Sequence, residues 1–304
     1  MQRKPKILVV GSANMDLIVQ TSHFPKPGET IIGGSFSMVP GGKGANQAVA
    51  AARLGGAVAL VARVGNDPFG HANLQDYQKE GINTANIEQD PKVPTGVAMI
   101  SVDKSGENTI IVASGANAGM GVDNLERASL LFEWADIVLL QLEIPLPVVM
   151  AAAIKAKEQG KLVILNPAPA CELPLALLEN ADIITPNEIE AEFLTGIAVT
   201  DFDSGKKAGL KLMEKGIQQV VITLGEHGAF MCNRELQEII PTAVVKAVDT
   251  TAAGDTFNGA LAVALGNGEV IHNAVRFALK AATRSVQRLG AQSSIPFLRE
   301  LEGM

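Results

Sequence analysis

Short runs of consecutive apolar residues recur along the chain, and segments with helical spacing lie between them. The apolar runs predict buried strands over Ile7–Val10, Ala57–Val64, Ile137–Leu140, Leu162–Leu165, Ile183–Ile184 and Val220–Leu224. Apolar positions repeat with helical periodicity in Ala45–Leu54, Leu125–Glu133, Val148–Glu158, Glu188–Leu194 and Ser204–Lys215. Alternating apolar strands and helices predict an α/β fold with a central, mostly parallel sheet covered by helices on both faces.

Two pairs of segments depart from this alternation and predict a small second sheet. They resemble antiparallel strands over Met15–Gln20 with Thr30–Val39 and over Gly96–Val102 with Asn108–Ala113. Good turn chemistry, Asp103-Lys104-Ser105-Gly106, joins the second pair. A small sheet leaves one face uncovered, so we expect it to act as a lid, a dimer surface, or both. We expect one domain, 1–304, whose β-lid is formed by about 14–40 and 95–114.

Composition describes a protein with a sizeable core and no broad basic surface. Of the 304 residues 47% are hydrophobic and 19% charged, and the net charge is −7. This charge and an aromatic content of only 4% argue against nucleic acid or an anionic membrane as a partner. Cys171 and Cys232 are too few for a disulfide scaffold, and Glu143, Pro145 and Pro147 interrupt the apolar region that follows residue 137. We therefore expect a cytoplasmic protein.

The most informative stretch is Asp249–Ala260. Val244, Val245 and Val248 predict a strand that meets a helical pattern ending near Leu265 through small residues. The first N–H groups of a helix have no partner inside the helix, and its dipole adds partial positive charge, so this junction predicts an anion pocket. Asp255 would lie where a transferring phosphoryl group passes, or it would simply cap the helix.

A glycine-rich turn, Pro40–Ala48, precedes another helix. It is not a P-loop, because Ser37 and Gly44 occupy positions where that motif requires glycine and a hydroxyl residue. It is not a dinucleotide fingerprint either, because Gln47 stands where the third glycine would fall. A helix N-terminus with Lys43 and Asn46 suits a polyhydroxylated ligand; the alternative is an ordinary tight turn.

Further polar residues follow the predicted strands. Asn14 and Asp16 come after the first strand, and Glu143 comes after Ile137–Leu140. Parallel α/β sheets bind ligands outside the carboxyl ends of their strands, which makes all three candidates for a site. Taken alone, they are equally readily turn residues or an exposed strand end.

These pieces together resemble a known family. Gly41-Gly42-Lys43-Gly44-Ala45-Asn46-Gln47-Ala48, followed by Ala51–Gly55, resembles the N-terminal signature of the ribokinase-like (PfkB) carbohydrate kinases, and Asp249–Phe257 resembles their C-terminal signature. Asn166–Pro169 and Thr185–Glu190 are similar to further segments of the family. The matches run in the expected order from about Gly11 to Ser294.

The resemblance implies transfer of a phosphoryl group from ATP to the 5-hydroxyl of D-ribose, giving D-ribose 5-phosphate and ADP. Asp255 would be the base that takes the hydroxyl proton. The residues that would hold the sugar are Asn14, Asp16, Gly42, Lys43, Asn46, Glu143 and Asp255. The residues that would contact the nucleotide or form the anion hole are Asn187, Thr223, Gly225, Gly228, Ala252, Ala253, Gly254 and Leu279.

The resemblance also implies two metal ions. Asn187 and Glu190 would order the waters around Mg²⁺, with Glu190 as its ligand through water. The residues at the positions of a monovalent cation site, expected to hold K⁺, are Asp249, Thr251, Ser285, Arg288, Gly290 and Ser294. Arg288 would contribute only its backbone carbonyl.

Two departures and several alternatives remain open. Leu279-Lys280 stands where relatives place a polar residue and alanine beside the adenine, and Leu289 replaces a residue that is often basic. The sugar would alternatively be 2-deoxyribose or another small sugar, or the chain would be a catalytically silent sugar-binding regulator. Apolar residues on the lid predict a homodimer; they are Ile18, Ile31, Ile32, Phe36, Met99 and Ile100.

Overall fold

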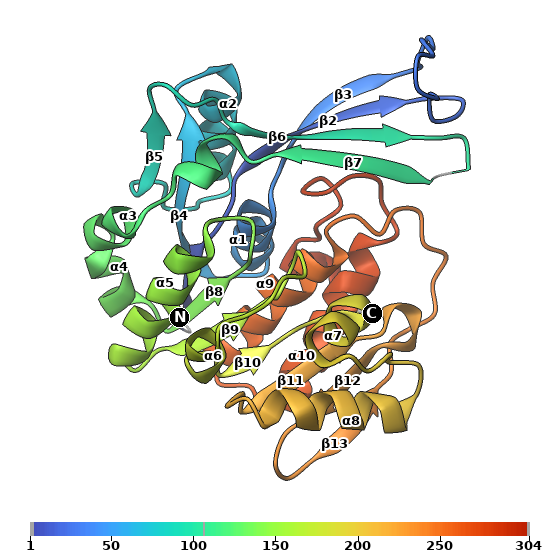
Figure 1. Ribbon diagram of the computed structural model, residues 1–304. Helices are drawn as coiled ribbons and strands as arrows, with labels where there is room; N and C mark the ends of the chain where they lie inside the picture. Colours follow the sequence, from blue (N-terminus) through green and yellow to red (C-terminus); the bar gives the residue numbers. More distant parts are fainter. Residues whose placement is uncertain (1–2, 106, 303–304) are drawn as a thin grey trace.

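The computed structural model describes residues 3–105 and 107–302. Gly106 of the expected turn, and residues 1–2 and 303–304 of the expected domain, lie outside these ranges. Within the described chain the larger sheet has nine strands in the order β13-β12-β11-β10-β9-β8-β1-β4-β5 (Figure 1). These strands are β1 (Lys6–Val10), β4 (Ala57–Gly65), β5 (Ile87–Asp90), β8 (Ile137–Leu140), β9 (Leu162–Leu165), β10 (Ile183–Ile184), β11 (Gln219–Thr223), β12 (Ala229–Cys232) and β13 (Gln237–Ile240).

Pairing within this sheet is parallel everywhere except at one edge. The six pairs from β5 across β1 to β11 are parallel, whereas β12 pairs antiparallel with both β11 and β13. The predicted mostly parallel sheet is therefore confirmed. The short strands β5, β12 and β13 were not predicted; in β5 and β13 charged and amide side chains interrupt any apolar run.

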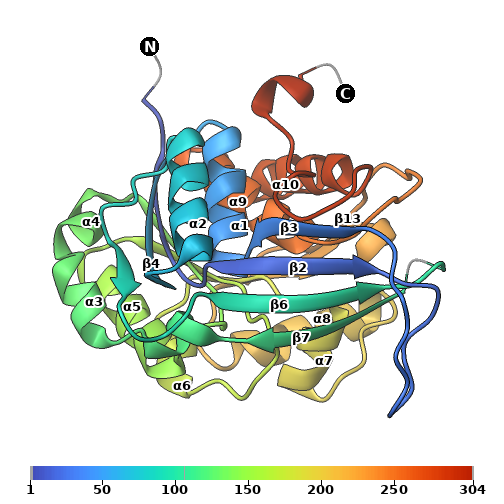
Figure 2. The ribbon, with the colours of Figure 1, turned by 90° about the horizontal axis from the view of Figure 1, so that it is seen from above.

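Helices cover both faces of this sheet. One face packs against α1 (Lys43–Arg53), α2 (Pro68–Lys79), α9 (Ala253–Gly266) and α10 (Ile271–Ser285). The opposite face packs against α3 (Val122–Arg127), α4 (Ser129–Trp134), α5 (Leu146–Glu158), α6 (Leu175–Glu179), α7 (Glu188–Thr195) and α8 (Phe202–Met213) (Figure 2). Successive residues of β1 serve the two cores alternately, Ile7 and Val9 the first, Leu8 and Val10 the second. Burial on both faces explains why β1 is continuously apolar.

The second sheet has four strands in the order β3-β2-β6-β7 and projects away from the larger sheet (Figures 1 and 2). Its strands are β2 (Asn14–Gln20), β3 (Phe36–Gly41), β6 (Gly96–Val102) and β7 (Asn108–Ala113). As predicted, β2–β3 and β6–β7 pair antiparallel, while β2 and β6 are parallel neighbours. The expected strand Thr30–Val39 begins only at Phe36, since glycines at positions 33 and 34 disfavour an extended strand.

Two other expectations were wrong. The predicted helix Leu125–Glu133 is two short helices, α3 and α4, that meet at Ala128. The predicted strand before α9 is an irregular segment, in which Val244 is 83% exposed. A β-branched run needs a partner strand or a buried face, and this segment has neither in the described chain. Its irregular path matters because it lines the cavity described below.

The remaining short elements are three 3₁₀ turns, η1 (Gly115–Gly119), η2 (Gly225–His227) and η3 (Leu298–Glu300). Among the described helices, none combines the length and the apolar character needed to cross a membrane.

Candidate active site

Asp255 lies buried in the first turn of α9 and is held by two amides from α1. Asn46 Nδ2 donates to its Oδ2 at 3.0 Å, and Gln47 Nε2 donates to its Oδ1 at 3.0 Å. The residue before the helix, Ala252, adopts left-handed backbone angles with φ 59°. Segments that lie some 200 residues apart in the sequence are thus joined at one carboxylate (209 residues for the Asn46 pair).

The glycine-rich turn brings α1 directly against the backbone that follows β1. Gly42 has φ 89°, and a Cβ there would lie 2.8 Å from the backbone nitrogen of Asn14. A Cβ on Gly44 would lie 2.6 Å from Ser12 N, so neither position accepts a side chain without displacing backbone. Glu143 completes the junction, since its Oε2 accepts from Lys43 N at 2.9 Å and from Ser12 Oγ at 2.5 Å.

The structure places Asn14 and Asp16 at the start of β2 and not in a turn. Asn14 pairs with Gly41 of β3, and Asn117 Nδ2 donates to its Oδ1 at 2.7 Å. Asn73 Nδ2 donates to the Asn14 carbonyl at 3.0 Å, which fixes the backbone as well. Both residues are buried where the small sheet leaves the α/β core.

Charges of both signs converge here. Burial, together with the nearby carboxylates of Glu143 and Asp255, raises the pKa of Asp16 to about 7. For Lys43, burial favours the neutral amine, but the negative charges of Asp255, Glu143 and Glu190 outweigh it and leave the pKa above its ordinary value. Lys43 is therefore a charged ammonium near three carboxylates.

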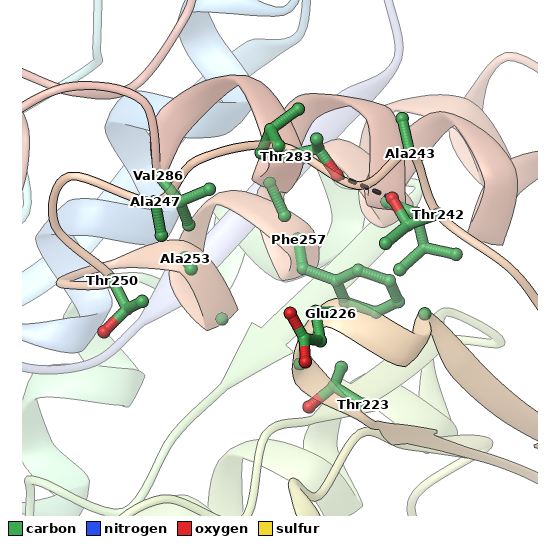
Figure 3. A pocket seen from close by; sticks show the side chains of 16 residues that line it. Thr223, Glu226, Thr242, Ala243, Ala247, Thr250, Ala253, Phe257, Thr283 and Val286 are labelled. Atoms are coloured by element: carbon green, nitrogen blue, oxygen red, sulfur yellow. Dashed lines mark hydrogen bonds between the residues drawn. The ribbon is translucent and has the colours of Figure 1, made fainter.

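A cavity of about 400 Å³ opens beside the first turn of α9 (Figure 3). Phe257 and Leu279 form part of its apolar wall, and Thr242 Oγ1 and Thr283 Oγ1 hydrogen-bond each other at 2.6 Å along one side. Of the residues expected at the nucleotide, Thr223, Gly225, Gly228, Ala253, Gly254 and Leu279 line it. A mostly apolar cavity of this size fits a purine nucleoside.

A smaller, polar cavity of about 180 Å³ adjoins it and shares Thr223, Thr250, Ala253 and Gly254. Its lining includes Lys43, Asn187, Glu190, Ala252 and Asp255. The apolar cavity therefore leads past the N-terminus of α9 to the polar cavity, which the Asp255 carboxylate lines.

Asn187 and Glu190 have a structural role in addition to their place in the polar cavity. They form a reciprocal capping box at the start of α7, with Glu190 N donating to Asn187 Oδ1 at 2.8 Å and Asn187 N donating to Glu190 Oε2 at 2.9 Å. Burial raises the pKa of Glu190 despite that hydrogen bond. Within residues 3–105 and 107–302, no group of three or more His, Cys, Asp or Glu could hold a metal ion by itself.

Asp249 joins two of the other residues expected around a monovalent cation, Thr251 and Gly290. Its Oδ1 accepts from Thr251 N at 2.9 Å and Thr251 Oγ1 at 2.6 Å, and its Oδ2 accepts from Gly290 N at 2.8 Å. These hydrogen bonds hold the pKa of Asp249 below its ordinary value although burial opposes the shift. Ser285 and Ser294 are both buried and lie close to Gly290 in the sequence. The Arg288 side chain pairs with Glu300.

Sequence reasoning missed a set of amide and hydroxyl side chains behind Asp255. Gln47 lies inside the glycine-rich motif, but no role was predicted for it there; it served only to exclude a dinucleotide fingerprint. The other members are Gln141, Asn166, Thr185, Asn258 and Gln292, which come from five separate segments. Phe257, which lines the nucleotide-sized cavity, was given no role from the sequence.

Comparison with known proteins identifies the family. Residues 4–298 match the model of the pfkB family carbohydrate kinases. A ribokinase of Haemophilus influenzae is 46% identical over 294 residues, covering 97% of this chain and 96% of that protein. A deoxyribokinase of Salmonella typhi is 38% identical over 295 residues, covering 97% and 96%.

The fold agrees with this assignment. The structure of an Arabidopsis thaliana ribokinase complexed with ribose and ATP superposes with a TM-score of 0.89 at 35% identity, covering 98% of both chains. This protein belongs to the pfkB family of carbohydrate kinases, and it is a phosphotransferase that acts on an alcohol group. The resemblance and the fold class predicted from the sequence are both confirmed.

Proposed function

We propose that this protein is an ATP-dependent kinase that phosphorylates the 5-hydroxyl of D-ribose. The observation that carries the proposal is the placement of Asp255. It lines a polar cavity, lies in the first turn of α9, and adjoins an apolar cavity with the size of a nucleoside. A ribokinase that is 46% identical over nearly the whole chain supports the choice of sugar.

The reaction requires one bond to form and one to break at the γ-phosphorus. The ribose 5-oxygen attacks, the bond from γ-phosphorus to the β,γ-bridging oxygen breaks, and ADP leaves with that electron pair. Asp255 takes the proton of the attacking hydroxyl, because each of its oxygens retains a lone pair beyond the amide it accepts. A loose phosphoryl transition state needs positioning and charge stabilisation above all.

Charge stabilisation comes from the helix N-terminus and Lys43. The backbone N–H groups of Ala252 and Gly254 face no carbonyl one turn earlier, so they remain available to the γ-phosphate. The Ala253 N–H donates to the carbonyl of Thr250 at 3.2 Å and is less available than the sequence predicted. The Lys43 ammonium lies in the same cavity and adds a positive charge.

The sugar is assigned to the space between α1 and the root of the small sheet. Asp16 and Asn14 would receive and donate hydrogen bonds to hydroxyls, and Asn46 and Glu143 would complete the set. Gly41 carries no side chain there, and a Cβ on it would collide with the Asp16 carboxylate, so glycine leaves room for that group. The small sheet projects beside this space and would act as its lid.

Glu190 and Asn187 fit a hydrated Mg²⁺. The capping box uses one oxygen of Glu190, Oε2, and both residues line the polar cavity. A single carboxylate suits an ion that keeps several waters and is bound mainly by substrate phosphates. When bound, Mg²⁺ would neutralise charge on the phosphates.

The Asp249 cluster fits K⁺ by its donor set. The hydroxyl groups of Ser285 and Ser294 each donate a hydrogen bond to a backbone carbonyl, at 2.8 Å. The lone pairs of both hydroxyl oxygens therefore remain available to a cation. Because Arg288 pairs its side chain with Glu300, only its carbonyl remains for a cation. Asp249 accepts hydrogen bonds from Thr251, just before Ala252, and from Gly290, after α10. A cation here would therefore order the segment that leads into Ala252.

A coupled ADP-release assay tests the function. Mg²⁺ATP is supplied with ribose, 2-deoxyribose, fructose or adenosine, each with and without K⁺. We expect turnover to be greatest with ribose and to increase with K⁺. We assign recognition of the ribose 2-hydroxyl to Asp16 with Gly42 and Lys43. Equal kcat/KM for ribose and 2-deoxyribose would overturn this assignment, since an unpaired buried polar group should cost about 1–3 kcal/mol.

The second candidate is a kinase for 2-deoxyribose. It is favoured by the 38% identity to the Salmonella typhi deoxyribokinase. A catalytically silent sugar-binding regulator is a third candidate; ribose binding without ADP release in the same assay would establish it. The cytoplasmic location stays a prediction from the sequence.

We also propose a homodimer through the small sheet. Ile32, Phe36 and Met99 are 98%, 57% and 58% exposed, and β7 is exposed along its whole length. Pairing two such sheets would cover these side chains. Light scattering at micromolar concentration should give twice the chain mass, and a monomer would contradict the proposal.

A further inference from the structure

Gln47 contacts the reacting carboxylate from the interior of the protein. Its Nε2 donates to Asp255 Oδ1 at 3.0 Å and to Asn166 Oδ1 at 3.1 Å. The side chain is completely buried. Gln47 is the fifth residue of α1 and directly follows Asn46. A substrate in the polar cavity therefore meets Asp255 but not Gln47.

Elementary chemistry determines which way this amide points. An ionised carboxylate only accepts hydrogen bonds, so Gln47 must present its NH₂ group to Asp255. Its Oε1 then faces Gln141, whose Nε2 donates to it at 2.6 Å. Gln141 is also fully buried and directly follows β8. Flipping either amide would place oxygen against oxygen or NH₂ against NH₂, so each glutamine locks the other.

The second bond of Gln47 continues into a closed ring. Asn166 Nδ2 donates to the Thr185 carbonyl at 3.2 Å, and Thr185 Oγ1 donates to Asn258 Oδ1 at 2.6 Å. Asn258 Nδ2 donates to the Gly254 carbonyl at 2.8 Å. Since Gly254 and Asp255 are consecutive, the ring closes on the first turn of α9. The carboxylate and the backbone of the anion pocket therefore share one hydrogen-bonded frame.

We propose that Gln47, oriented by Gln141, is a positioning residue that holds the Asp255 carboxylate aimed at the 5-hydroxyl of the sugar. This inference rests on the proposed function, in which Asp255 is the base. Asn46 supplies the matching bond to Oδ2 but is also assigned to the sugar, whereas Gln47 is separable from substrate binding. The other charged groups that act on Asp255 are Asp16 from β2, Lys43 from α1 and Glu190 from α7.

Removing the amide should change catalysis more than binding. In Gln47→Met the Asp255 carboxylate loses one of its two amide donors and gains rotational freedom. We expect kcat to fall about 10- to 100-fold and KM for ribose to change less than about threefold, because the sugar contacts remain. Because methionine does not titrate, we expect this loss of kcat to be similar across the pH range.

The isosteric variant Gln47→Glu separates positioning from packing. When protonated, its carboxyl group can donate to Asp255 Oδ1; when ionised, it repels Asp255. Its kcat should therefore approach that of the unmodified protein at acidic pH and fall as pH rises, whereas the loss in Gln47→Met should not depend on pH in this way. A role in packing alone predicts no such difference between the two variants.

The experiment measures kcat and KM for ribose from about pH 5.5 to about pH 9 in both variants, with thermal unfolding as a control for folding. Gln219→Met is the matched control, because Gln219 starts β11 at the opposite end of the strands. A loss of kcat that grows with pH in Gln47→Glu, beside a pH-independent loss in Gln47→Met and a near-normal KM in both, supports the inference. Unchanged kcat in Gln47→Met, or an equal loss in Gln219→Met, overturns it.

An Asp255→Asn arm separates this inference from the proposed function. If Asp255→Asn keeps its turnover, the base assignment fails and the positioning role of Gln47 fails with it. If Asp255→Asn is inactive while Gln47→Met has normal kcat and a normal pH profile, only the role of Gln47 is wrong.

Discussion

The two chambers of the active site are built on different principles. Around Asp255 the polar chamber is held by directional hydrogen bonds, with Asn46 and Gln47 on its two oxygens. The larger chamber is bounded by apolar side chains such as Phe257 and Leu279, and one of its walls is an irregular segment. The first chamber controls where single protons and charges lie, whereas the second controls shape. Substitutions in the polar chamber should therefore reduce catalytic activity far more than substitutions of similar size in the apolar chamber.

The largest effect is expected for Asp255→Asn. The variant keeps the volume of the side chain but cannot accept the hydroxyl proton, so kcat should fall by at least about 10³-fold. Ribose binding, measured by calorimetry, should change little by comparison. Residual turnover within tenfold of the unmodified protein would show that no side-chain base at this position is needed.

The next largest effect is expected for Asp16→Asn. An amide replaces a carboxylate that accepts hydrogen bonds from the sugar, so KM for ribose should rise about 10- to 100-fold. In the unmodified protein the raised pKa of Asp16, about 7, means that the carboxylate becomes protonated below that pH. KM for ribose should accordingly rise as pH falls through 7, and the variant should lose this dependence. A pH-independent KM in the unmodified protein would contradict the assignment.

The same residue predicts a trend in stability. Because folding raises the pKa of Asp16 above its unfolded value of 3.8, the folded state binds the proton more tightly. This contribution to the free energy of unfolding is full below about pH 4 and is lost as pH rises through about 7. At pH 8, Asp16→Asn should therefore be more stable by about 1–2 kcal/mol in urea denaturation. Lower stability of the variant would show that Asp16 is compensated by other contacts.

The contrast between the chambers also explains what could be predicted from the sequence. Gly42, Lys43 and Asp255 were found because the chemistry is concentrated in two short motifs next to helix starts. The frame behind them was not found, since Gln47, Gln141 and Asn166 meet only once β8, β9 and α1 are side by side. Polar residues scattered singly along a sequence carry no periodicity that marks them as partners.

The apolar chamber was harder to predict for another reason. Val244, Val245 and Val248 have the composition of a strand, and only the absence of a partner in the described chain leaves them irregular. A helix that follows the small residues and ends near Leu265 was nevertheless predicted, and the place of Leu279 at the nucleotide was implied by the family resemblance. The local sequence pattern therefore located the helix, whereas the absence of a partner strand, a tertiary effect, made the segment before it irregular.

A smaller effect is expected in the apolar chamber. Leu279→Ala removes apolar contact from the cavity wall, so KM for ATP should rise about 3- to 10-fold while kcat and KM for ribose stay within about twofold. Leu289→Ala is the control, because Leu289 is 70% exposed and does not line the cavity. A fall in kcat as large as that of Gln47→Met would remove the distinction between the chambers.

The smallest effect is expected for Ala252→Gly, between the chambers. Ala252 has φ 59°, which glycine adopts without steric cost, but glycine also gains entropy in the unfolded chain. The two effects nearly cancel, so the free energy of unfolding should change by less than about 1 kcal/mol and kcat by less than about threefold. A tenfold loss of kcat would show that the strained residue itself contributes to catalysis.

The most direct test of the proposed reaction is ³¹P nuclear magnetic resonance of a mixture of the protein, Mg²⁺ATP and D-ribose. We expect the γ-phosphate signal to be replaced by one phosphate monoester signal, split by the two protons on C5 of the sugar, and we expect Asp255→Asn to leave ATP intact. Inorganic phosphate as the only new signal, or an ester on another carbon, would contradict phosphoryl transfer to the 5-hydroxyl of ribose.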